Sequence, residues 1–259
     1  MWLTALWAVL AMGVTWLRQR RTHDAGPVDL VWTLGVGLTA LVHAVTSSGW
    51  GPRRVLVAAL AGLWAARLAL HLARRLRAGP EDGRYAELRA RLGARADLWF
   101  LIFFQVQAGL VVGLGLVFLV LCSAEQEGWR ASDGLAVALF ALALAGESRA
   151  DRELARWRAE PANRGRTCRA GLWRFSRHPN YFFEWLHWVA YPVLGLGLAH
   201  GAWLWLAPLA MYVLVAHVTG IPPAEAQALR SRGEDYRHYQ RTTNAFFPGP
   251  PRAPHGVPQ

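Results

Sequence analysis

Four polar side chains recur at helical spacing within an apolar stretch of the chain, residues 179–191 (PNYFFEWLHWVAY). They are Asn180, Glu184, His187 and Tyr191, at positions i, i+4, i+7 and i+11. At about 100° per residue they fall within an arc of roughly 60° and extend about 16 Å along a helix. Ionisable groups in an apolar helix are costly unless they face a cavity or one another. The spacing therefore predicts a polar pocket beside this helix.

Two other apolar segments carry similar stripes. One stripe consists of Trp64, Arg67, His71 and Arg75, and the other of Glu147, Asp151, Leu154 and Arg158. Taken singly, each stripe can be a buried ion pair, a set of hydrogen bonds between helices, or an anchor to lipid headgroups. Three stripes that open toward the same side of a membrane favour one shared polar cavity, because one cavity would explain them all.

The elements that position these stripes must be membrane helices. Of 259 residues, 54% are hydrophobic, and the mean hydropathy is +0.17, too apolar for an ordinary soluble domain. Stretches that could cross a bilayer run over 1–17, 28–46, 55–73, 97–121, 131–147, 181–198 and 202–219. We predict an all-α bundle of about seven transmembrane helices. It would form a single domain over 1–248, followed by a proline-rich disordered tail over 249–259.

Charge is distributed unevenly between the loops. All 28 basic residues are arginine, and 24 of them lie in 18–27, 74–96, 148–180 or after 219, which are alternate loops of the predicted topology. By the positive-inside rule the N-terminus is outside and the C-terminus cytoplasmic, in a bacterial inner membrane. A net charge of +11 without a nucleic-acid recognition fold favours anionic lipids or a phosphorylated cofactor as partners over nucleic acid.

The sequence gives no indication of a cleavable signal peptide, a disulfide bond or a metal site. The first apolar run lacks a basic region before it and is expected to remain as a span rather than be cleaved as a signal peptide. Cys122 and Cys168 fall on opposite sides of the predicted membrane, so they are not expected to pair. The histidines and cysteines show no metal-site spacing, so we expect no metal. The oligomeric state is not indicated.

The chain resembles a known family over three neighbouring blocks. They are ADRELARWRAEPANRGRTCRAGLW, GLWRFSRHPNYFFEW and TGIPPAEAQALRSRGEDYRHYQRTTNAFFPGPP. The family is the bacterial DUF1295 family, relatives of the steroid 5-alpha-reductases, and the likeness runs from about Asp29 to Arg252. A shorter RHPNYxxE block also occurs in isoprenylcysteine carboxyl methyltransferases and sterol C14 reductases, so it indicates a superfamily more than a reaction.

The resemblance implies a pocket, open to the cytoplasm, that holds NADPH. In the steroid reductases an asparagine and a glutamate that match Asn180 and Glu184 hold the cofactor, and further ligands fall in the flanking segments. The implied cofactor-binding residues are Glu147, Asp151, Arg158, Arg166, Arg177, His178, Asn180, Tyr181, Glu184, Glu225, Tyr236, Tyr239 and Arg241.

The residue types support a dinucleotide independently of the resemblance. Nine arginines lie within 148–180, beside the expected N-terminus of a helix at Pro179. Arginine forks and helix N-terminal N–H groups both suit phosphates. Because no GxGxxG follows a strand, the cofactor would be bound by a helical bundle and not by a Rossmann domain.

The resemblance implies hydride transfer to the β carbon of a C=C bond conjugated to a carbonyl, in a lipid-like substrate taken from the bilayer. The steroid reductases use an acid on the second helix and a tyrosine on the third. Asp29 is the candidate acid, although it could merely favour a helix N-terminus. Trp64 takes the place of the tyrosine, and an indole N–H can donate a hydrogen bond but cannot serve as a proton source. We take Asp29, Trp64 and Glu184 as the catalytic candidates.

Phe183 is a second departure, because relatives usually have glycine before the glutamate. The ring can narrow the pocket or point away from it, so the substrate can be a steroid, an isoprenoid or a fatty enone. Two other functions stay open. One is S-adenosylmethionine-dependent methyl transfer, against which the arginine-rich loop and the seven spans both argue. The other is non-catalytic lipid binding, which would not need the arginines.

Overall fold

The computed structural model describes residues 2–78, 81 and 83–252, and their regular structure is helical, without strands. The chain divides into two compact units. The first comprises residues 1–129 and 197–201, and the second comprises residues 130–196 and 202–259. We describe each unit by itself.

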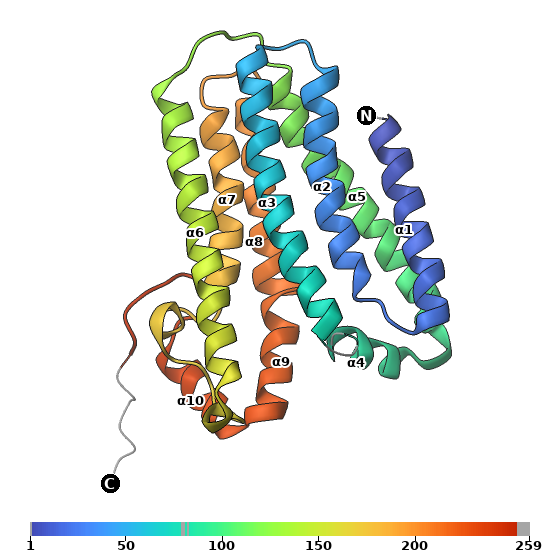
Figure 1. The fold of residues 1–259 in the computed structure, drawn as a ribbon, viewed down its shortest axis with the longest axis vertical. Coiled ribbons are helices and arrows are strands. Elements are labelled where there is room, and N and C mark those ends of the chain that lie inside the picture. The colour runs from blue at the N-terminus through green and yellow to red at the C-terminus, as the bar shows by residue number, and fades with distance from the viewer. Residues whose placement is uncertain (1, 79–80, 82, 253–259) are drawn as a thin grey trace. The chain divides into compact units, whose positions relative to one another are not determined.

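The first unit is built from four long helices and one short one. They are α1 (Trp2–Thr22), α2 (Pro27–Thr46), α3 (Gly51–Ala78), α4 (Gly83–Leu92) and α5 (Ala96–Cys122), with the 3-10 turn η1 (Gly93–Arg95) before α5. α5 packs against α1 and α2, and α2 packs against α3 (Figure 1). A Cβ on Gly37 would come within 2.6 Å of the Cβ of Ala65, so this glycine permits the close approach of α2 and α3.

The short helix α4 folds back onto the start of α5. The buried ring of Tyr85 meets Phe100 edge-on, with 6.2 Å between the ring centroids. The guanidinium of Arg89 lies over the Phe100 ring, 4.7 Å from its centroid. Aromatic packing therefore holds α4 against α5. The position of α4 determines which side chains the Tyr85 hydroxyl can contact.

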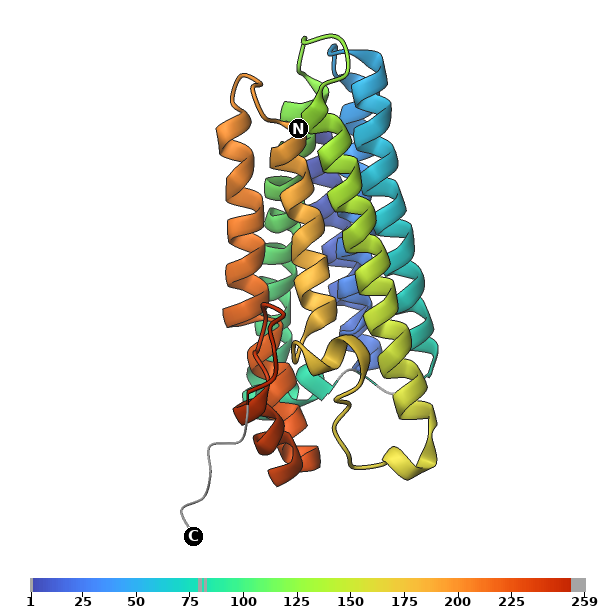
Figure 2. The same ribbon diagram turned by 90° about the vertical axis from the view of Figure 1, so that its left-hand side faces the viewer.

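The second unit begins with two long helices that lie side by side, α6 (Ala131–Ala159) and α7 (Pro179–Leu194) (Figure 2). Between them run the 3-10 turns η2 (Pro161–Asn163) and η3 (Gly171–Arg174). The remaining elements are η4 (Gly201–Trp205), α8 (Leu206–Val213), the π-helical turn η5 (Leu214–Val218), α9 (Ile221–Arg232) and α10 (Glu234–Thr242).

Five segments are long and apolar enough to cross a membrane within the described part of the chain. They are residues 27–46, 51–77, 83–122, 131–159 and 201–232. The helical structure and these five segments confirm the prediction of an all-helical membrane protein. The other two predicted spans coincide with α1 and α7, but α7 has 16 residues, fewer than the roughly 20 that a span needs. The count of seven spans and the orientation of the termini therefore stay predictions.

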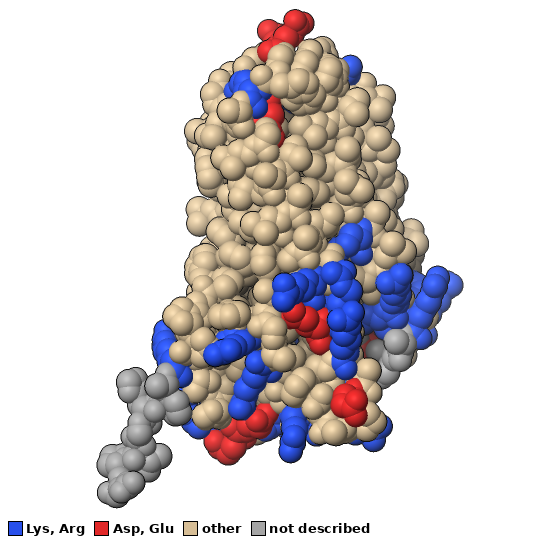
Figure 3. Space-filling view, turned by 60° about the vertical axis from the view of Figure 1, so that its left-hand side comes forward, with Lys and Arg blue, Asp and Glu red and all other residues tan. Residues whose placement is uncertain are grey.

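Surface composition agrees with a membrane environment. A broad area of the face drawn in Figure 3 carries no charged side chain. On α1, large apolar side chains such as Trp2 and Leu3 are 89% and 77% exposed, as expected for groups that face lipid.

The tail predicted to be disordered is partly attached. The backbone N–H of Gly249 donates to the carbonyl of Phe175 at 3.0 Å, and that of Arg252 donates to the carbonyl of Thr242 at 2.8 Å. Residues 253–259 lie outside the described residues.

Candidate functional site

The contact between α6 and α7 explains the departure at Phe183. The Phe183 ring is directed at Gly146 of α6, and a Cβ on that glycine would lie 2.4 Å from the nearest ring carbon. A glycine on α6 thus makes the space that the Phe183 ring occupies. Phe183 is therefore accommodated by packing between the two helices.

Polar side chains from both helices lie along this contact. The Asn180 amide donates to Asp151 Oδ1 at 3.4 Å, which links α7 to α6. Glu147 on α6 and Glu184 on α7 are buried, with 5% and 8% of their surface exposed. Nδ1 of His187 lies 2.5 Å from the carbonyl oxygen of Glu184 and 3.9 Å from its carboxylate. We call Glu147, Asp151, Asn180 and Glu184 the α6–α7 polar face.

The chemistry of this face suits a ligand that donates hydrogen bonds. Three of its four members are carboxylic acids, which accept when ionised, and the fourth is an amide that can accept and donate. A carboxamide or the hydroxyls of a sugar would match such groups. An isolated anion would not, because it would be repelled by the carboxylates.

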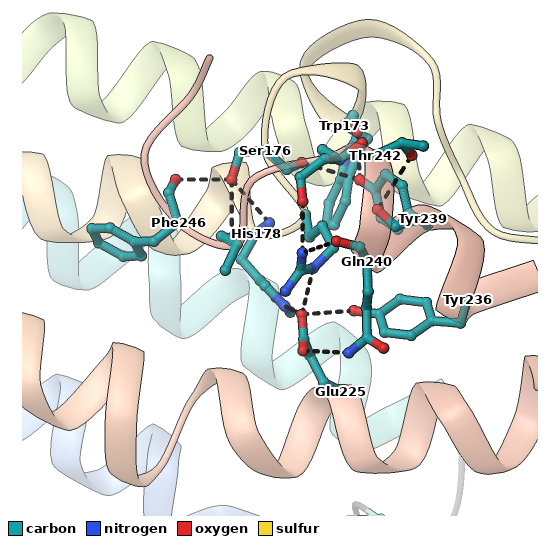
Figure 4. Close-up of polar contacts among 12 residues, drawn as sticks. Trp173, Ser176, His178, Glu225, Tyr236, Tyr239, Gln240, Thr242 and Phe246 are labelled. Carbon is teal, nitrogen blue, oxygen red and sulfur yellow. Dashed lines mark hydrogen bonds and ion pairs between the residues drawn. The ribbon is translucent and has the colours of Figure 1, made fainter. Parts of the chain in front are cut away.

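A second polar cluster is centred on Glu225 of α9, and Figure 4 shows how its members converge. Arg177 Nε donates to Glu225 Oε1 at 2.6 Å, and both side chains are nearly buried, with 11% and 14% exposed. The other partners of the carboxylate are His178 Nε2 at 3.2 Å, the Tyr236 hydroxyl at 3.2 Å and Gln240 Nε2 at 2.7 Å. We call these five residues the Glu225 cluster. Its members are satisfied by one another.

The cluster fixes the segment that leads into α7. Arg177 Nη1 also donates to the carbonyl oxygens of Gln240 and Thr243, at 3.0 and 2.6 Å. The Ser176 hydroxyl donates to the carbonyl of Phe246 at 2.8 Å and accepts from the backbone N–H of His178 at 3.1 Å (Figure 4). The N-terminus of α7 is therefore anchored to the C-terminal part of the chain.

Tyr239 and Asp235 attach the preceding loop to α10. The buried hydroxyl of Tyr239 donates to the carbonyl oxygens of Trp173 and Ser176, the latter at 3.1 Å. Asp235 accepts from the backbone N–H of Thr167 and pairs with Arg169, each at 2.6 Å. Burial alone would raise the pKa of Asp235, but these bonds outweigh it and lower the pKa.

His178 is held as a neutral ring in this setting. Burial lowers its pKa from 6.5, and the nearby guanidiniums of Arg177 and Arg232 act in the same direction, while the bond to Glu225 opposes them. Its ring lies parallel to that of Tyr181, with an interplanar angle of 6° and centroids 5.4 Å apart. The ring of Tyr181, in the first turn of α7, is thereby held against His178.

We expect the depressed pKa of His178 to make stability depend on pH. Above about pH 6.5 the ring is neutral in both the folded and the unfolded protein, so it does not reduce the free energy of unfolding. As the pH falls below this value the unfolded chain binds the proton first, and the free energy of unfolding decreases. Thermal unfolding between pH 7.5 and pH 5 would show a steeper loss of stability in the wild-type protein than in His178→Gln. Equal slopes in the two proteins would contradict the assignment.

The structure brings some of the sequence-predicted cofactor residues together and leaves others apart. The α6–α7 polar face contains four of them: Glu147, Asp151, Asn180 and Glu184. The Glu225 cluster contains four others, which are Arg177, His178, Glu225 and Tyr236, together with Gln240. Arg158, Arg166 and Arg241 are exposed on the surface. Arg158 has a contact within the protein.

The nine arginines of 148–180 also divide into two sets. Four have partners within the protein: Arg149, Arg158, Arg169 and Arg177. The side chains of the other five make no hydrogen bond or ion pair within the residues that the structure describes: Arg152, Arg156, Arg164, Arg166 and Arg174. These five guanidiniums could engage a phosphate without giving up a partner in the described part of the chain.

In the first unit Asp29 has two strong partners. Arg84 Nη2 donates to Asp29 Oδ2 at 3.0 Å, and the Tyr85 hydroxyl donates to Asp29 Oδ1 at 2.8 Å. The two contacts fix the position of the Asp29 carboxylate between α2 and α4. Trp64 is buried on α3 and meets Trp32 edge-on, with the ring centroids 6.0 Å apart.

We expect Tyr85→Phe to lower the free energy of unfolding by about 1.5 to 3 kcal/mol, because a hydrogen bond to a charged group is lost. Tyr212→Phe is the matched control, since the Tyr212 hydroxyl makes no hydrogen bond within the described part of the chain. Denaturant unfolding of both variants in detergent tests the difference. An equal effect of the two substitutions would contradict it.

Sequence reasoning missed Tyr85, Gln240 and Ser176. Tyr85 lies 56 residues from Asp29, in a short helix outside the apolar segments that carry the polar stripes. Gln240 could have been found, because it follows Tyr236 at i+4 and so shares its helix face. Ser176 contacts the C-terminal segment through its hydroxyl, and no periodicity indicates such a contact.

Comparison with known proteins gives a family. The family model described as protein of unknown function (DUF1295) matches residues 15–243. No curated protein and no solved structure matches the chain.

Proposed function

The chain belongs to the DUF1295 family, and on that premise we propose that it is an integral membrane oxidoreductase. It uses NADPH to reduce a C=C bond conjugated to a carbonyl in a lipophilic substrate. The observation that carries the proposal is the α6–α7 polar face, where Asn180 bonds Asp151 and Glu184 is buried. It lies next to a segment with five arginines that have no partner among the described residues.

The donor set fits a nicotinamide dinucleotide. Glu184 and Asn180 would hold the carboxamide by accepting from its N–H groups and donating to its oxygen. Tyr181, stacked on His178, would offer a flat surface for a ring. Exposed arginines such as Arg166, together with the first N–H groups of α7, would hold the phosphates. When bound, the cofactor would supply the hydride.

The Glu225 cluster has a different role in this proposal. Its groups are already bonded to one another, so Glu225 and Arg177 would act by holding the start of α7 in place. Asn180 and Glu184 would then keep the orientation that a ligand needs.

Reduction of an enone places developing negative charge on the carbonyl oxygen, which requires a donor. Of the catalytic candidates, Trp64 can donate a hydrogen bond but not a proton, because an indole N–H does not release one. Asp29 is held by Arg84 and by the Tyr85 hydroxyl, which directs its single proton at Asp29 Oδ1. The substrate would be an apolar enone from the bilayer, with the arginine-rich loops on the cytoplasmic side of a bacterial inner membrane.

The experiment that tests the proposal is thermal unfolding of the detergent-purified protein with NADPH, NADH or S-adenosylmethionine. A ligand that binds the folded state raises the melting temperature. We expect NADPH to do so, after which enones can be screened by the oxidation of NADPH. Stabilisation by S-adenosylmethionine alone would identify a methyltransferase and overturn the proposal. If none of the three ligands stabilises the protein, the assignment of a cofactor is wrong and non-catalytic lipid binding is the remaining function.

A further inference from the structure

The contact between the Phe183 ring and Gly146 lies among the polar groups of the α6–α7 polar face. Each of these two residues is followed directly by a buried glutamate of that face. The hydrogen bond from Asn180 to Asp151 is reached only about 7.5 Å further along α6, at 1.5 Å per residue. The ring and the glycine therefore belong to the packing that holds the polar groups of the two helices opposite each other.

This contact leaves no room for a side chain on α6. A Cβ at residue 146 would lie within 2.6 Å of three carbons of the Phe183 ring. Carbon atoms in contact are ordinarily about 3.5 Å or more apart. The ring is backed by Phe182, which meets it edge-on with 5.2 Å between the centroids and is itself packed against Trp185 and Phe246. An alanine at residue 146 would therefore push α6 and α7 apart by about 1 Å.

The hydrogen bond between the helices would not survive such a movement. The Asn180 amide nitrogen and Asp151 Oδ1 are 3.4 Å apart, already longer than the roughly 2.7 to 3.2 Å that is usual for an N–H···O bond. A further separation of about 1 Å would break the bond. The glutamates of the polar face would move apart with their helices, so a ligand that contacts both helices would lose its geometry.

We propose that Phe183 and Gly146 form a size-matched spacer, which sets the distance between the two sides of the α6–α7 polar face and thereby its affinity for a ligand. The inference rests on the proposed function, in which this ligand is NADPH. Both members of the spacer are positioning residues, because neither offers a polar side chain to the ligand. The sizes of the side chains at 146 and 183 can then be changed only together without loss of binding.

Titration of NADPH against detergent-purified variants tests the spacer. We expect Gly146→Ala to weaken binding about tenfold, because polar contacts across the two helices are lost. Phe183→Leu shortens the side chain that the new Cβ would meet, so the double variant should bind within about threefold of the wild type. Gly134→Ala is the matched control, because it makes the same change on α6 at a position where a Cβ would have no neighbour within 4 Å. It should bind NADPH as the wild type does.

A cross-linking measurement reads the spacing without the cofactor. Cysteines are introduced by Asp151→Cys and Asn180→Cys, at side chains that meet across the two helices. A short bifunctional thiol reagent then joins them, and the joined peptides are quantified by mass spectrometry. We expect slower cross-linking when Gly146→Ala is added, and recovery of the rate when Phe183→Leu is added as well.

The two readouts separate failure of the spacer from failure of the proposed function. If the wild type does not bind NADPH but cross-linking responds to Gly146→Ala, the proposed function is wrong and the spacer stands. The spacer is overturned if Gly146→Ala leaves cross-linking unchanged, or if it binds NADPH as a binding-competent wild type does. It is also overturned if the double variant is no better than Gly146→Ala. Thermal unfolding shows which variants are folded, and where Gly146→Ala alone is unfolded, recovery in the double variant decides.

Discussion

Replacement of Glu184 by glutamine is expected to weaken NADPH binding by about 10- to 100-fold without unfolding the protein. The reason is that a carboxylate on the α6–α7 polar face would be replaced by a neutral amide of the same shape. A charge-assisted hydrogen bond contributes about 1.5 to 3 kcal/mol, which corresponds to that range of affinity. Binding is measured by titration of NADPH against the detergent-purified variant.

The control for this prediction is Glu160→Gln, which makes the same chemical change at an exposed residue after the end of α6. It should bind NADPH as the wild type does. Arg158→Ala should also weaken binding, because it removes a positive charge near the phosphates. If Glu184→Gln and Arg158→Ala both retain wild-type affinity, the α6–α7 polar face is not the cofactor site.

Replacement of Glu225 by alanine is expected to lower the free energy of unfolding by about 3 to 5 kcal/mol. It would leave the guanidinium of Arg177 nearly buried, at 11% exposed, and without its carboxylate. Removal of one partner of a buried ion pair has an effect of that size, because the remaining charge is uncompensated. His178, Tyr236 and Gln240 would lose a partner as well.

The chain offers a matched control for Glu225 within the same unit. Glu234 pairs with Arg237 on α10, but these side chains are 72% and 57% exposed. Glu234→Ala should therefore change the free energy of unfolding by less than about 1 kcal/mol. Denaturant unfolding in detergent compares the two variants. A loss at Glu225 no larger than that at Glu234 would show that the Glu225 cluster does not stabilise the second unit.

The sequence determined the helices and the helix faces that carry polar groups. The seven apolar stretches overlap α1, α2, α3, α5, α6, α7 and the run from η4 to η5, because only helices satisfy their backbone groups within one segment. No apolar stretch predicted α4, α9 or α10. The period of 3.6 residues placed Asn180 and Glu184 on one face of α7, and Glu147 and Asp151 on one face of α6. That Asn180 bonds Asp151 depends on the rotation of both helices, which periodicity does not give.

Only the tertiary structure decided which partners meet across long separations in the chain. The bond from Tyr85 to Asp29 spans 56 residues, and the pair of Arg177 and Glu225 spans 48. The contact between the Phe183 ring and Gly146 likewise appears only when the two helices are packed. Spacing along the chain fixes which side chains share a face, since that is a local property of the backbone. Which face meets which depends on side-chain volumes and charges from distant segments, and these act only once the chain has folded.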